Sequence, residues 1–124
     1  MQLEIEIKTQ DKALMRDIMG MKKGGEVAEE IDIPGNARLR RRVRVRKMAG
    51  AEMTLTAIGF LLEFGRDVAA IVVGAWLYEK IRGGRASAII IEKTEVEFNE
   101  GDIKRVLIER IEMALKNEGQ KAKE

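Results

Sequence analysis

The chain has 124 residues, of which 45% are hydrophobic and 35% are charged, and its formal net charge is +2. A chain of this length and composition is typical of one globular domain with its own core. Cysteine and histidine are both absent. Their absence excludes disulfides, thiol nucleophiles, nearly all zinc sites and the usual proton carrier of serine-type triads. We therefore expect no metal site, no cofactor and no enzymatic activity.

The first segment predicts a strand. Leu3, Ile5 and Ile7 alternate with charged residues over 2–8, which is the two-residue period of a half-buried strand. The same segment lacks the apolar core of a signal peptide, so we expect a cytoplasmic protein. The heavy use of glutamate, lysine and arginine is typical of proteins from thermophiles.

A short helix and a hairpin follow. Thr9 is suited to cap a helix that runs to about Met19, where a glycine-rich segment ends it. Apolar and charged residues then alternate over 27–33, and Pro34-Gly35-Asn36 is a strong turn signal. The segment after this turn, 37–47, alternates again and predicts the second strand of a hairpin.

Arginine occupies every second position of this second strand, from 38 to 46. If the turn is a three-residue loop, the acids of the first strand face the arginines, whereas a two-residue loop puts acids opposite apolar residues. The pattern therefore favours the three-residue loop. This register pairs Ile33 with Ala37, Asp32 with Arg38, Ile31 with Leu39 and Glu30 with Arg40.

Two interpretations of the arginine row stay open. It is either the exposed face of a strand, balanced by acidic rows on neighbouring strands, or a surface that binds nucleic acid or another polyanion. The candidates for binding are Arg42, Arg44 and Arg46, because the hairpin register assigns them no acid. Arg41 falls on the inward face, so it lies at an edge or a bulge, or it anchors an anion. No aromatic residue lies near the row, which weakens the case for stacking on single strands.

Two apolar segments come next. The spacing of Leu55, Ile58, Leu61 and Leu62 predicts a helix over about 54–64, and a second helix is predicted over 67–81. Charged residues at the junction, Glu63, Arg66 and Asp67, favour an ion-pair corner over a catalytic carboxylate pair. Charges at a bilayer centre cost about 2.5–3.5 kcal/mol each, so we expect no transmembrane span.

The second of these helices has no polar face, because residues 68–76 are all apolar or glycine. A helix that is apolar all round is buried on all sides, and a domain this small offers little cover. We therefore predict a homo-oligomer that packs through helix 67–81. The predicted interface residues are Ala70, Val73, Gly74, Trp76 and Leu77, with Ala70 and Gly74 allowing close approach of another helix.

The remaining segments predict two strands and a helix. Strands are expected over 86–92 and 95–98, and an amphipathic helix from Glu100 to about Gly119 has its apolar stripe at Ile103, Val106, Leu107, Ile111 and Leu115. The predicted fold class is α+β, with an antiparallel or mixed sheet of four to five short strands and three to four helices, two of them strongly apolar. We expect a single domain over 1–119 and a disordered tail over 120–124.

A combination of features in the second half of the chain resembles a known family. These features are the junction Phe64-Gly65-Arg66 between two apolar helices, Ala75-Trp76-Leu77 near a helix end, a basic glycine turn, a hairpin and a final amphipathic helix. Together they resemble the effector-associated constant component domains of prokaryotic conflict systems, over about residues 53–115. The longer arginine-bearing hairpin ahead of them departs from the family pattern. The resemblance implies a non-enzymatic accessory module that associates with a separate protein effector, and it implies no site residues.

The leading functional prediction is therefore a non-catalytic interaction module that self-associates through helix 67–81. The alternative is a nucleic-acid-binding protein that uses the arginine strand 38–46.

Overall fold

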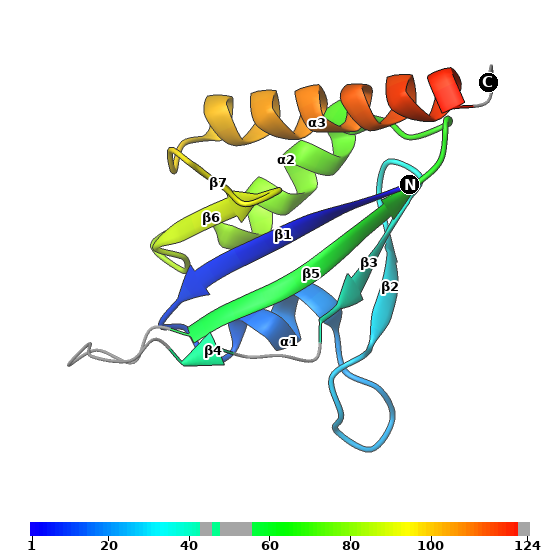
Figure 1. Cartoon of the computed structure of the whole chain (residues 1–124). Coiled ribbons are helices and arrows are strands. Elements are labelled where there is room, and N and C mark those ends of the chain that lie inside the picture. The colour runs from blue at the N-terminus through cyan, green and yellow to red at the C-terminus, as the bar shows by residue number, and fades with distance from the viewer. Residues whose placement is uncertain (43–45, 48–55, 122–124) are drawn as a thin grey trace.

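The computed structural model describes residues 1–42, 46–47 and 56–121 (Figure 1). These residues form one antiparallel sheet with helices packed on one face. The elements follow in the order β1 (Gln2–Thr9), α1 (Leu14–Met19), β2 (Glu30–Ile33), β3 (Ala37–Arg41), β4 (Arg46–Lys47), β5 (Thr56–Phe64), α2 (Ala70–Ile81), β6 (Ala88–Ile91), β7 (Thr94–Val96) and α3 (Glu100–Lys121). The strand order is β2-β3-β5-β1-β6-β7, and the two-residue strand β4 also pairs with β5. The α+β class is confirmed, but the described part of the sheet is larger than the four to five strands predicted.

The core lies between the sheet and the helices. At the centre of the sheet β1 pairs with β5, so that Ile5 stands opposite Phe60 and Ile7 opposite Ile58, and all four side chains are buried. They form one apolar cluster with buried residues of all three helices. In Figure 1, α1 and α2 lie behind the sheet, α3 runs across α2, and the front face of the sheet carries no helix. We call this front face the open face.

Residues 56–64 form strand β5, so the helix predicted over 54–64 is wrong. Ile58, Phe60 and Leu62 are buried on the helix-covered face, as the two-residue period of a strand requires. Leu61 lies on the open face, and its apolar side chain is what made the spacing look helical. Because β5 pairs with both β1 and β3, a helix here would divide the sheet into two parts, β2-β3 and β1-β6-β7. Of the helices in the described ranges, only α2 is therefore strongly apolar.

Thr9 does not cap a helix, because it is the last residue of β1 and α1 begins only at Leu14. Its hydroxyl accepts a hydrogen bond from the N–H of Asp11 at 2.9 Å and donates one to the carbonyl of Arg85. The guanidinium of Arg85 in turn lies 2.7 Å from Asp11. These contacts tie the end of β1 to the segment that precedes β6.

Helix α3 confirms the amphipathic stripe predicted for the end of the chain. Ile103, Leu107 and Ile111 are buried against the core, and the helix runs to Lys121, two residues past the predicted end at Gly119. Part of the predicted tail, 120–121, is therefore helical, and the rest lies outside the described residues.

The β2–β3 turn packs on the start of α2. The carbonyl of Gly35 accepts a hydrogen bond from the N–H of Ala69 at 2.8 Å, and Asn36 Nδ2 donates to the carbonyl of Asp67 at 3.2 Å. A Cβ atom on Gly35 would lie 2.8 Å from Val73 Cγ2 and 2.9 Å from the Ala69 oxygen. Only glycine fits this contact, so the turn and the helix are closely docked.

Candidate interaction surfaces

The β2–β3 hairpin has the register predicted from the sequence. Ile33 pairs with Ala37, Asp32 with Arg38, Ile31 with Leu39 and Glu30 with Arg40. Arg38 Nε donates to Asp32 Oδ1 at 3.1 Å, and this hydrogen bond raises the pKa of the Arg38 guanidinium above its usual value. The acids and arginines of the hairpin thus lie on one face of the sheet and neutralise each other.

The strands beyond the hairpin supply further acids to the arginine row. Arg40 lies 3.4 Å from Glu30 and 3.2 Å from Glu63 of β5. Arg42 Nη1 lies 3.5 Å from Glu4 of β1. All three arginines of the row that the structure describes with side chains therefore meet a carboxylate. The prediction assigned no acid to Arg42, because the register of the hairpin alone does not bring β1 near β3.

Arg42 reaches β1 by crossing β5 at a glycine. The N–H of Arg42 donates to the carbonyl of Gly59 at 2.9 Å, and a Cβ atom on Gly59 would lie 3.3 Å from both Cβ and Cδ of Arg42. The aliphatic part of Arg42 therefore lies across Gly59, as long cationic side chains often lie on sheet surfaces. The absence of a side chain at position 59 lets Arg42 pair with Glu4.

Arg41 lies on the other face of the sheet from Arg40 and Arg42. It stands opposite Phe60, on the helix-covered face at the end of β3, and it is partly exposed. It lines a pocket with Lys22, Glu29, Glu30 and Arg40. Within the described ranges no carboxylate lies within 4.0 Å of the charged atoms of Arg41 or Lys22.

Arg46 belongs to β4, opposite Ala57, and Arg44 lies outside the described residues.

Three of the five predicted interface residues lie in the core of the chain itself. Val73, Gly74 and Leu77 are buried, and a Cβ atom on Gly74 would lie 3.2 Å from Lys104 Cγ and 3.4 Å from Lys104 Cα. The close helix approach expected at Gly74 is therefore made by α3 of the same chain. Ala70 and Trp76 are partly exposed.

The exposed apolar residues of α2 are ones that the sequence did not single out. The side chain of Ile71 is 67% exposed and that of Val72 44%. Ala75 lies one turn further along and is partly exposed, so these three residues form a short apolar stripe on the outside of the helix. The sequence did carry a signal for this stripe, because residues 68–76 have no polar face. Whichever side of the helix points away from the core must therefore be apolar.

Charged residues at the start of α2 do not form the predicted corner. Glu63 pairs with Arg40 because β5 places it on the open face. Arg66 is exposed and has no ion pair with Glu63 or Asp67 in the described part of the chain. Across residues 1–42, 46–47 and 56–121, no group of three or more acidic residues is arranged to hold a metal ion, and no helix has the length and apolar character needed to cross a membrane.

Comparisons with family models, curated proteins and solved structures find no match to this chain. The resemblance to effector-associated constant component domains therefore stays a prediction. One of its supporting features changes, since the apolar segment before Phe64-Gly65-Arg66 is strand β5 and not a helix.

Proposed function

We propose that this chain is a non-catalytic interaction module that self-associates through the exposed start of α2. The observation that carries the proposal is the exposure of Ile71 and Val72 side by side on the outside of the helix. Full burial of one such side chain is worth about 1.5–3 kcal/mol, so a surface that covers both has a substantial driving force. Association with a separate effector protein in the cytoplasm is part of the same proposal, and the family resemblance supports it.

A second copy of the chain is a suitable partner for the apolar stripe, because it brings an apolar stripe of its own and complementary charges at the two ends. Arg66 precedes the stripe and Glu79, which lies 2.6 Å from Arg82, follows it, and both are exposed. An antiparallel twofold pairing centred near Val72 places Arg66 of each copy beside Glu79 of the other. Isologous contacts of this kind are the commonest way in which soluble proteins self-associate. Opposite charges at the ends of the contact would also fix its orientation.

We expect the wild-type protein to sediment as a dimer at micromolar concentration and the double variant I71E/V72E to sediment as a monomer. The new carboxylates would be buried without partners in the dimer, which is very costly. They should leave the fold intact, because both positions are exposed in the single chain. The control is Met113→Glu, which puts one new carboxylate on α3 at a side chain 53% exposed. It should leave the dimer unchanged. A monomeric wild type contradicts the proposal.

A second candidate function is binding of nucleic acid or another polyanion at the end of β3. It is favoured by Arg41 and Lys22, which line one pocket and have no carboxylate partner among the described residues. Binding through phosphates carries no base information, so we expect no sequence preference and a linear fall of log affinity with log salt. The double variant R41Q/K22Q should weaken binding, whereas Arg42→Gln should matter less because Arg42 is held by Glu4.

The test is a titration of labelled DNA and RNA, single-stranded and double-stranded, at low salt. Absence of binding in about 50 mM salt contradicts this second function, because phosphate contacts are strongest under those conditions. The arginine row is then a strand face balanced by acids, and self-association alone is left.

A further inference from the structure

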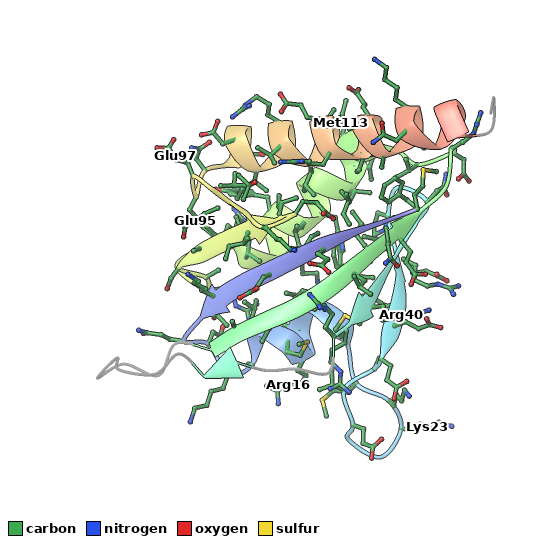
Figure 2. The ribbon with its side chains drawn as sticks, in the orientation of Figure 1. Arg16, Lys23, Arg40, Glu95, Glu97 and Met113 are labelled. Atoms are coloured by element: carbon green, nitrogen blue, oxygen red, sulfur yellow. The ribbon has the colours of Figure 1, made fainter. Side chains whose placement is uncertain are left out.

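A groove lies along one edge of the sheet, between β7 and α3. β7 is the last strand in the sheet order, so its outer edge has no neighbouring strand in the described chain. The groove has a volume of about 480 Å³. One wall is the strand segment 94–97, and the other is formed by Asp102, Arg105, Val106, Glu109 and Arg110 of α3. Figure 2 shows Glu95 and Glu97 at the same outer margin of the molecule.

The backbone of β7 has hydrogen-bonding groups that point away from the sheet. The turn between β6 and β7 consists of Glu92 and Lys93, and both have positive φ, at 48° and 66°. In a two-residue turn of this kind the flanking residues form a hydrogen-bonded pair, and the next pair along does not. The next pair here is Ile90 and Glu95. The N–H and C=O of Glu95 are therefore directed outward, at the edge.

The groove is acidic along its strand wall. Its lining contains four carboxylates, at 95, 97, 102 and 109, and two guanidinium groups, at 105 and 110. Arg105 is already held by Asp102 at 3.3 Å and by Glu109 at 3.5 Å. Glu95 and Glu97 are exposed and have no cation within 4.0 Å among the residues described.

The charged side chains of the α3 wall have partners on both sides of the groove. Arg110 donates to the Thr94 hydroxyl at 3.4 Å. The hydrogen bond from Asn99, and after it the one from Arg105, holds the pKa of Asp102 below its usual value. The lining keeps a net charge of −2, from four carboxylates and two guanidinium groups, and among the described residues Glu95 and Glu97 are the acids of this lining that have no cation partner.

We propose that this groove binds an extended basic segment of another protein, which joins the sheet as a further strand beside β7. The outward N–H and C=O of Glu95 require an extended chain, because strand addition uses backbone hydrogen bonds. Glu95 and Glu97 require lysine or arginine at alternate positions of that chain. The positions between them face the groove floor at Val96 and Val106 and take small apolar residues. The recognised pattern is therefore basic and apolar residues in alternation.

The groove goes beyond the proposed self-association, because it is formed by β7 and α3 and uses none of the residues of the α2 stripe. Short edges with acidic side chains also discourage pairing between copies of one protein. A second copy in this groove would place Glu95 of one strand against acids of the other, whereas a basic segment meets no such repulsion.

The test is a fluorescence-anisotropy titration with the labelled peptide KVKVKVK, acetylated and amidated at its ends. We expect saturable binding to the wild type and affinity at least about tenfold lower for E95K/E97K, because both charge contacts become repulsive. The matched control is Glu112→Lys, an exposed charge reversal on α3 outside the groove, and it should bind as the wild type does. Equal losses in both variants would overturn the assignment of the site.

A second peptide separates strand addition from simple charge attraction. The same sequence with N-methyl groups on the backbone nitrogens of its lysines keeps every charge, but it cannot donate to the Glu95 carbonyl while a lysine stands opposite Glu95, so it should lose at least about tenfold in affinity. Equal binding of the two peptides, or no binding of either, overturns the proposal. The titration is repeated on I71E/V72E, where retained binding shows that the groove acts independently of self-association.

Discussion

Replacement of Phe60 by alanine is expected to lower the free energy of unfolding by about 3–5 kcal/mol, the usual cost of removing a buried aromatic side chain. Phe60 has 0% of its surface exposed and stands at the centre of the sheet, opposite Ile5 on one side and Arg41 on the other. Domains of this size are stable by about 5–15 kcal/mol, so the change removes a large part of the total. Urea unfolding followed by the fluorescence of the single tryptophan, Trp76, measures it.

The matched control is Leu61→Ala, one residue along the same strand. Leu61 is partly exposed on the open face, so its loss should cost only about 1 kcal/mol, as is usual for residues outside a core. Equal costs at the two neighbouring positions would contradict a strand over 56–64, because a strand sends successive side chains to opposite faces.

Replacement of Gly35 by alanine should lower the free energy of unfolding by about 2–4 kcal/mol, from two sources that add. The φ angle of Gly35 is +96°, a region that residues with a Cβ rarely adopt. The new Cβ would also lie 2.8 Å from Val73 Cγ2 and 2.9 Å from the Ala69 oxygen. To accommodate it, the β2–β3 turn must move away from α2.

Gly24→Ala isolates the first of these sources. Gly24 has a similar φ of +102°, but a Cβ there would meet nothing within 4 Å. It should cost about 1 kcal/mol through the backbone alone. Thermal unfolding of the two variants side by side measures the difference, and equal losses would show that the turn is not docked on the helix.

The hairpin register could be predicted because the information is local. Acids and arginines repeat with the same two-residue period on either side of a recognisable turn, so only one loop length puts Asp32 opposite Arg38 and Glu30 opposite Arg40. The amphipathic stripe of α3 was predictable for the same reason, since Ile103, Leu107 and Ile111 recur at helical spacing within one segment.

Strand β5 was not predictable in this way. Its local pattern is ambiguous, because Leu61 is apolar on the open face and Gly59 is a residue that weakens the interior of a strand. What allows a strand here in spite of this pattern lies elsewhere in the chain. Gly59 is covered by Arg42, and the strand is stabilised by pairing with β1, whose residues are 47 to 61 positions away in the chain. Local propensity contains neither fact.

The candidate surfaces were missed for a related reason. The sequence of α2 indicates an apolar helix but not which of its sides α3 covers, and Lys104 of α3 determines that Gly74 is inside and Ile71 outside. The pairing of Arg42 with Glu4 likewise depends on β5 lying between their strands. The groove beside β7 depends on the strand order of the whole sheet, which no single segment encodes.

A disulfide cross-linking experiment tests self-association through α2 most directly. The chain contains no cysteine, so Val72→Cys introduces a single thiol near the proposed twofold axis. Under mild oxidation at micromolar concentration, we expect this variant to form a covalent dimer rapidly. Lys116→Cys, which places an exposed thiol on α3, should cross-link slowly. If Val72→Cys forms covalent dimer no faster than Lys116→Cys, cross-linking reflects random collision alone, and the proposal is contradicted.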